Sequence, residues 1–216
     1  MKKFAIVLSG CGVFDGAEIH EATLCMLSIS RLGGAYQVFA PNIQQHHVIN
    51  HLTGEKMDES RNVLVESARI ARGKIRELKE FKAEEFDGLL FPGGFGAAKN
   101  LGSWAFDGAD ASVLPELEGA IKGMVEQNKP IGALCISPVI LAKVLGAVKL
   151  TIGDDEGTAQ AVESAGATHV QTTHGQVVVD SNFKVVTTPC YMLDANIAQV
   201  ADGANNVVKA MLELME

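Results

Sequence analysis

The segment Pro130-Ile131-Gly132-Ala133-Leu134-Cys135-Ile136-Ser137-Pro138 places an apolar run directly before a cysteine and a helix-opening proline. The run predicts a buried strand, and Pro138 predicts the first turn of a helix, where a missing N–H donor costs nothing. A strand that becomes a helix this abruptly holds its central residue in a strained backbone conformation. The small residues Ala133 and Ser137 leave room for that turn. We therefore expect Cys135 at a tight strand-to-helix turn, where the positive helix end favours a thiolate.

Apolar runs of strand length alternate with helical patterns along the rest of the chain. Further strands are predicted at Phe4–Leu8, Tyr36–Ala40, Gly88–Phe91, Leu150–Gly153, Val177–Val179 and Phe183–Thr187. Helices are predicted at Ala17–Arg31, Asn62–Ala71, Leu114–Glu126, Pro138–Leu145, Met192–Val200 and Asn205–Leu214. This alternation predicts an α/β fold with a mainly parallel central sheet and helices on both faces.

The length of 216 residues suits a single domain spanning 1–216. Residues 42–85 fit the alternating pattern least, although Lys74–Leu78 has the composition of a strand. We interpret 42–85 as an elaboration of the domain near the rim of a site.

Composition excludes several function classes. Hydrophobic residues make up 47% of the chain and charged residues 20%, which are ordinary globular values. The net charge of −8 argues against non-specific binding to nucleic acid or to anionic membranes. No apolar run approaches the ~20 residues of a membrane helix. The apolar stretch Phe4–Leu8 after Met1-Lys2-Lys3 is shorter than the ~7–15 residues of a secretory signal core, so a first strand is expected there.

The four cysteines Cys11, Cys25, Cys135 and Cys190 form neither a CxxC pair nor a zinc-binding spacing. Scattered free cysteines in a chain of this size indicate a reducing compartment, so we expect a cytoplasmic protein without a structural metal.

A second glycine-rich segment follows the predicted strand Gly88–Phe91, reading Pro92-Gly93-Gly94-Phe95-Gly96. In a parallel sheet such bends lie at the carboxyl edge, where ligands bind. The backbone amides of Gly93 and Gly94, together with the residue after the cysteine, Ile136, are candidates for binding substrate and stabilising an oxyanion. A nucleotide phosphate loop is the rival interpretation, but the spacing is neither GxGxxG nor that of a P-loop, and we expect no cofactor.

Four further blocks carry a family resemblance, namely 10–21 (GCGVFDGAEIHE), 49–55 (INHLTGE), 92–101 (PGGFGAAKNL) and 187–192 (TTPCYM). Over essentially the whole chain, the sequence resembles the enhancing lycopene biosynthesis, or sigma cross-reacting, family of glutamine-amidotransferase-like proteins within the DJ-1/PfpI superfamily. The resemblance implies a flavodoxin-like, class I glutamine amidotransferase-like fold and a homodimer. It also implies a weak glyoxalase that converts glyoxal-type dicarbonyls to hydroxy acids without glutathione.

Two glutamates, Glu18 and Glu21, lie just after the first predicted strand and share one helical face. A thiol that adds to an aldehyde needs one neighbouring acid–base group with a pKa near neutrality. The resemblance implies a glutamate hydrogen-bonded to the cysteine and favours Glu21, with Glu18 as the alternative.

The histidine pattern departs from two relatives of this superfamily. No histidine has a glutamate two residues later, as an amidotransferase triad would require, and position 136 is Ile where a peptidase of the superfamily has His. Glutaminase and peptidase activities therefore lose support. His46, His47 and His51 have spacings that a metal site would allow, but no carboxylate or cysteine completes the set, and rim positions are expected.

The leading hypothesis is a cofactor-free glyoxalase acting on a small dicarbonyl or aldehyde through Cys135. The alternative is a non-catalytic redox or stress-responsive protein whose cysteine is oxidised. A third possibility, an ammonia-producing subunit for isoprenoid metabolism, loses support with the missing His-x-Glu pair. Cys190 follows a predicted strand toward the same edge, where it either pairs with Cys135 under oxidation or packs as an ordinary thiol.

Overall fold

A computed structural model describes all residues 1–216 of the chain. Its strands are β1 (Lys3–Val7), β2 (Ala35–Ala40), β3 (Ile75–Glu77), β4 (Gly88–Phe91), β5 (Ile131–Leu134), β6 (Lys149–Leu150), β7 (Thr168–His169), β8 (Val178–Asp180) and β9 (Val185–Thr188). Its α-helices are α1 (Ile19–Arg31), α2 (Val63–Ile70), α3 (Phe95–Asn100), α4 (Trp104–Asp107), α5 (Pro115–Glu126), α6 (Pro138–Leu145), α7 (Glu156–Ser164) and α8 (Ile197–Glu213). The predicted fold class, α/β with a mainly parallel sheet, is confirmed.

Seven strands form the central sheet in the order β3-β2-β1-β4-β5-β9-β8. All neighbours pair in parallel except β8, which is antiparallel to β9. The chain builds outward from β1 on one side and from β4 on the other, so the strand order reverses between these two strands. Ligands of such open sheets bind at the carboxyl ends of the strands beside this reversal.

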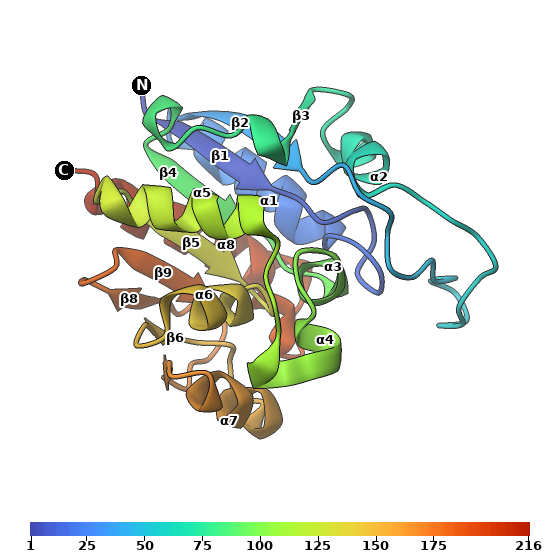
Figure 1. Ribbon diagram of the computed structural model, residues 1–216. Coiled ribbons are helices and arrows are strands. Elements are labelled where there is room, and N and C mark those ends of the chain that lie inside the picture. The colour runs from blue at the N-terminus through green and yellow to red at the C-terminus, as the bar shows by residue number, and fades with distance from the viewer.

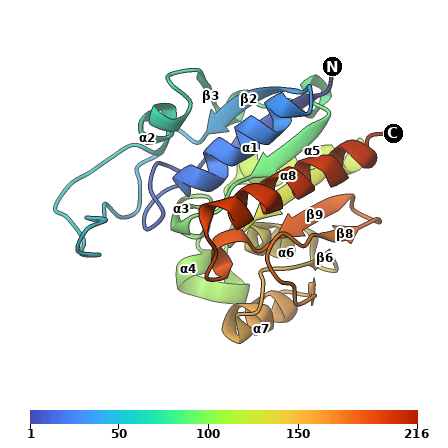
Figure 2. The same cartoon turned by 180° about the vertical axis from the view of Figure 1, so that it is seen from behind.

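Helices cover both faces of the sheet, as Figures 1 and 2 show from opposite sides. Helices α1 and α8 pack side by side on one face, and α5 and α6 lie on the other. Each face of the sheet has its own hydrophobic core, and alternate residues of β1 belong to each. Phe4 and Ile6 pack with α1 and α8, whereas Ala5 and Val7 pack with α5. Because both faces are covered, the central strands are apolar on both sides rather than alternating.

The two predicted closing helices are one 17-residue helix, α8. It begins after Asn196, which forms a capping box with Gln199. The two predicted ranges leave out residues 201–204, which include Gly203, a residue type that weakens helix interiors. In the structure, a Cβ at Gly203 would lie 3.0 Å from the sulfur of Cys190, so this glycine permits close packing. Neither α8 nor any other helix combines the length and apolar character needed to cross a membrane.

The predicted strand at Leu150–Gly153 was also wrong in its extent. Only Lys149–Leu150 forms a strand, and it pairs with β7 in a separate two-stranded sheet. Helices α3, α4 and α7 were not predicted. Helix α7 begins after Asp155, whose side chain accepts a hydrogen bond from the Thr158 amide, an N-cap that the sequence contained.

The segment between β2 and α2 extends away from the sheet (Figure 1). It contains only isolated bridges, Gln44 with Asn62 and Ile49 with Lys56. Helix α2 and the edge strand β3 then return the chain to the sheet. The assignment of 42–85 as an elaboration of one domain, and the homodimer, stay predictions.

Candidate active site

Cys135 lies directly between β5 and α6, with a left-handed φ of 59°. Its amide donates to the carbonyl oxygen of Thr188 at 3.0 Å. The hydroxyl of Ser137 donates to the carbonyl oxygen of Pro92 at 2.6 Å, which ties the turn to the glycine-rich segment after β4. The strained cysteine between small neighbours is therefore present where the sequence predicts it.

The carboxyl group of Glu21 lies beside the thiol of Cys135: a Cβ built at Gly93 would lie 2.7 Å from Oε2 of Glu21 and 2.9 Å from the sulfur. Glu21 is on the inward face of α1 and has no solvent exposure. One oxygen, Oε2, accepts from the amide of Gly93 at 2.7 Å, and Oε1 accepts from the amide of Tyr191 at 3.3 Å. Three segments thus converge on this carboxyl: α1, the bend after β4, and the turn after β9.

Burial sets the protonation of this pair. Burial and, to a smaller extent, the charge of Glu18 together raise the pKa of Glu21 from 4.5 to about 8, against the two amide donors. Burial also raises the pKa of the Cys135 thiol, and the charge of Glu21 adds to this effect. The backbone amides of Gly94 and Ile136 act in the opposite direction and lower the pKa of this thiol, because an N–H donor favours the thiolate. The first proton lost therefore leaves one negative charge shared by sulfur and carboxylate, and it titrates as a property of the pair.

The two glycine amides have different partners. Gly93 donates to Glu21, which is a correction to its predicted role as an oxyanion donor. A Cβ at Gly93 would lie 2.4 Å from the Cβ of Cys135, so only glycine brings the backbone this close. Gly94 and Ile136, in contrast, have backbone amides that lower the pKa of the Cys135 thiol. These two amides are the candidates to stabilise a carbonyl oxygen that becomes negative beside the sulfur.

Glu18, the alternative acid, caps helix α1 instead. Its Oε2 accepts from the amide of Glu21 at 2.7 Å, and its own amide donates to the carbonyl oxygen of Gly93 at 2.9 Å. The side chain satisfies one of the free N–H groups at the helix start. Its contribution to the thiol is therefore indirect, through the pKa of Glu21.

A cavity of about 330 Å³ opens over the thiol. Its lining includes Tyr191, Asp155 and Thr158, none of which was a predicted site residue. The phenol of Tyr191 lies 2.8 Å from Nδ1 of His20. The position of Tyr191 after the strand that ends at Thr188 was the available signal, because neighbouring parallel strands end at one edge.

The other histidines and cysteines lie elsewhere. His46 packs against Phe106 with ring centroids 4.3 Å apart, and His51 accepts a hydrogen bond from the amide of Phe14 at 3.2 Å. All four cysteines are free thiols, and Cys190 packs beside Val200. No group of three or more His, Cys, Asp or Glu side chains is arranged to hold a metal ion.

Comparison with known proteins gives the family. The DJ-1/PfpI family matches residues 13–195. The mitochondrial glutamine amidotransferase-like class 1 domain-containing protein 3 of Homo sapiens is 46% identical, covering 98% of this chain and 83% of its own length. The mitochondrial ES1 protein of Danio rerio is 35% identical, covering 97% of this chain and 85% of its own length.

Solved structures agree with this assignment. An isoprenoid biosynthesis protein with an amidotransferase-like domain from Ehrlichia chaffeensis is 37% identical, with a TM-score of 0.94 over 100% of both chains. A glyoxalase III from Candida albicans has a TM-score of 0.63 over 97% of both chains. Its identity of 16% makes it a relative in fold alone.

The expected cytoplasmic location is contradicted, because these curated relatives, including the ES1 protein homolog of Rattus norvegicus at 47% identity, are mitochondrial. The expectation rested on free cysteines. Free cysteines report a reducing environment, and that property does not identify one compartment.

Proposed function

Because the chain belongs to the DJ-1/PfpI family, with ES1-type proteins among its relatives, we propose that it is a glutathione-independent glyoxalase. It converts a dicarbonyl such as glyoxal or methylglyoxal to the hydroxy acid through a hemithioacetal on Cys135. The observation that carries the proposal is the buried Glu21 carboxyl, which lies beside the Cys135 thiol and has a pKa of about 8. A group with a pKa this close to neutrality suits both removal and return of a proton.

In the first step, the sulfur of Cys135 attacks the aldehyde carbon of the dicarbonyl. The carbonyl π electrons move to oxygen, which develops negative charge near the amides of Gly94 and Ile136. The proton shared by the thiol and Glu21 is transferred to that oxygen. The product is a hemithioacetal beside an ionised Glu21.

In the second step, Glu21 removes the proton from the former aldehyde carbon, and the electron pair of that C–H bond forms an enediolate. The hydroxyl proton on the former aldehyde carbon moves to the neighbouring oxygen, and Glu21 returns its proton to the neighbouring carbon, which yields the thioester of a 2-hydroxy acid. Water then hydrolyses the thioester, which releases the hydroxy acid and restores the thiol. One carbon is oxidised and its neighbour is reduced, so the sequence needs no external oxidant or reductant.

The alternative of a redox sensor receives less support. Sensor cysteines react as exposed thiolates of low pKa. Cys135 is only 6% exposed, and burial raises its pKa. An amide substrate is also poorly served, because no histidine lines the cavity over the thiol to protonate a departing nitrogen.

The test is consumption of methylglyoxal by the purified protein without glutathione. We expect slow turnover by the wild type and none by Cys135→Ala. Cys190→Ala is the matched control, since it removes another buried cysteine near the same sheet edge, and it should retain turnover. Undiminished activity in Cys135→Ala, or robust hydrolysis of glutamine by the wild type, would contradict the proposal.

A further inference from the structure

A second cavity adjoins the one over Cys135 and is larger, at about 530 Å³. The two share Phe95, Ile136 and Thr158 in their linings. Glyoxal and methylglyoxal are small enough to be accommodated in the thiol cavity alone. The combined space is of the size that proteins use for ligands with an extended body.

The second cavity is lined mainly by apolar side chains. Phe14 and Phe95 are 38% and 49% exposed, and Trp104 lies beside them. Aromatic surface left in contact with water in a hollow favours the binding of an apolar group that covers it.

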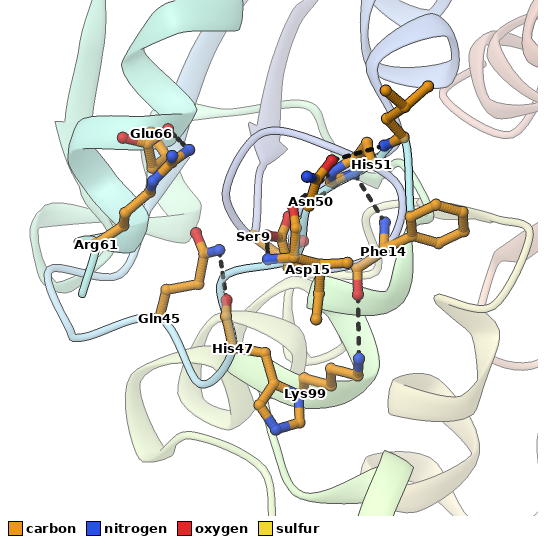
Figure 3. Close-up of polar contacts among 12 residues, drawn as sticks. Ser9, Phe14, Asp15, Gln45, His47, Asn50, His51, Arg61, Glu66 and Lys99 are labelled. Atoms are coloured by element: carbon orange, nitrogen blue, oxygen red, sulfur yellow. Dashed lines mark hydrogen bonds and ion pairs between the residues drawn. The ribbon is translucent and has the colours of Figure 1, made fainter. Parts of the chain in front are cut away.

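Hydrogen bonds hold the wall of this cavity in place (Figure 3). The amide of Phe14 donates to Nε2 of His51 at 3.2 Å, and its carbonyl oxygen accepts from Nζ of Lys99 at 3.0 Å. Buried Asp15 accepts from the amide of Ile49 at 2.6 Å. These bonds join the loop after β1 to the segment after β2, so a ligand meets a wall that is already formed.

Lys99 is the one charged residue in this lining. The ammonium group has three donors, and the hydrogen bond to Phe14 uses one of them. Asp155 is charged as well, but it lines the thiol cavity. The larger cavity therefore presents an apolar surface with one cation, Lys99, and the carboxylate of Asp155 lies on the side of the thiol.

We propose that the physiological substrate is a dicarbonyl with an aliphatic tail that ends in an anionic group, a carboxylate or a phosphate. The dicarbonyl head lies at Cys135, the tail covers Phe14, Phe95 and Trp104, and the anionic end binds Lys99. The assignment of the head rests on the proposed glyoxalase function. The binding site for the tail does not.

Trp104 provides a direct readout of occupancy, because it is the single tryptophan of the chain and lines the cavity. Its fluorescence is followed while octanoate, octyl phosphate or octanol is added to the wild type and to Cys135→Ala. We expect a saturable change with both anions in both proteins, and binding of octanol weaker by about tenfold. The anion that binds more tightly, octanoate or octyl phosphate, identifies the end group of the substrate as a carboxylate or a phosphate.

Lys99→Met keeps the apolar stem and removes the charge, and Lys99→Arg restores a charge. Binding of the anions should fall by about tenfold or more in Lys99→Met, recover in Lys99→Arg, and stay unchanged in the control Lys122→Met on α5. Circular dichroism checks that each variant is folded. No saturable change in the wild type, or equal anion binding by Lys99→Met and the wild type, would overturn the tail site.

Turnover separates this inference from the glyoxalase proposal. A dicarbonyl with a carboxylate-ended tail should have a kcat/KM at least about tenfold above that of methylglyoxal. Lys99→Met should remove much of that advantage, whereas the control Lys122→Met on α5 should keep it. Octanoate binding without turnover of either dicarbonyl would refute the glyoxalase function and the substrate assignment, while the anion site stands. Methylglyoxal turnover without octanoate binding would refute the tail site alone.

Discussion

Cys135 and Cys190 follow the neighbouring strands β5 and β9, and both have a left-handed backbone, with φ of 59° and 43°. Both are buried. Their surroundings differ: the backbone amides of Gly94 and Ile136 lower the pKa of the Cys135 thiol, whereas the sulfur of Cys190 points at the carbonyl oxygen of Val200, 3.9 Å away. An N–H donor stabilises a thiolate, and a carbonyl oxygen stabilises a protonated thiol.

A strained, buried cysteine at the end of a strand is therefore not enough for reactivity. Cys135 has a carboxyl partner, amide donors and an open cavity, and Cys190 packs against Gly203 under α8. The reactivity of a buried cysteine therefore depends on the polar groups around its sulfur rather than on its backbone conformation.

The largest effect after loss of the thiol itself is expected for Glu21→Gln. The amide keeps the shape of the side chain but neither accepts nor returns the proton, so turnover of methylglyoxal should fall by about 100- to 10,000-fold. Steady-state kinetics measures this. A loss of turnover of less than about twofold would show that Glu21 does not transfer the proton. The carboxyl partner would then not explain why Cys135 reacts and Cys190 does not.

The free energy of unfolding of Glu21→Gln, measured against pH, checks that this variant is folded and that Glu21 carries the buried proton. Burial raises the pKa of Glu21 from 4.5 to about 8, so the folded protein holds this proton more tightly than the unfolded chain. Its contribution to stability is complete below the unfolded pKa and is lost as the pH rises through about 8. Denaturant unfolding should show this decline, on the order of 5 kcal/mol, in the wild type but not in Glu21→Gln.

Each of the two cysteines packs against a glycine, Gly93 beside Cys135 and Gly203 beside Cys190. In Gly93→Ala the new Cβ would meet the Cβ of Cys135 at 2.4 Å, and the two packed segments must separate. We expect a loss of roughly 1–3 kcal/mol in the free energy of unfolding and a loss of turnover. In Gly203→Ala the Cβ meets the sulfur of Cys190 at 3.0 Å, while alanine favours the helix.

The net change for Gly203→Ala should stay within about 1 kcal/mol, with turnover retained. Urea unfolding and methylglyoxal kinetics on both variants provide the measurement. Similar activities in the two variants would show that the close approach at Gly93 does not support the site.

The sequence predicted the fold class and the turn at Cys135, because apolar runs and turn residues act locally. It left Glu18 and Glu21 unresolved, since both share one helical face. The structure separates them because α1 begins at Ile19, which leaves Glu18 as the cap and turns Glu21 inward. The cap spacing, with Glu18 accepting from the amide three residues on, was a usable signal.

Contacts between distant segments were beyond local reasoning. The amide of Gly93 was predicted to face a substrate, but its direction depends on Glu21, which lies 72 residues away in the chain. Tyr191 reaches the same carboxyl from the turn after β9. The continuity of α8 through Gly203 was missed, because the packing of Gly203 against Cys190 is visible only in three dimensions.

The most direct test of the account is the pH dependence of kcat/KM for methylglyoxal. The reactive pair carries one proton, and its first ionisation lies near the pKa of about 8 for Glu21. Below that pH, kcat/KM should rise about tenfold per unit as the fully protonated pair loses a proton, and it should level off near pH 8. A profile that is flat from about pH 6 to about pH 9, or one that Glu21→Gln reproduces with the same midpoint, would contradict the thiol–carboxyl pair.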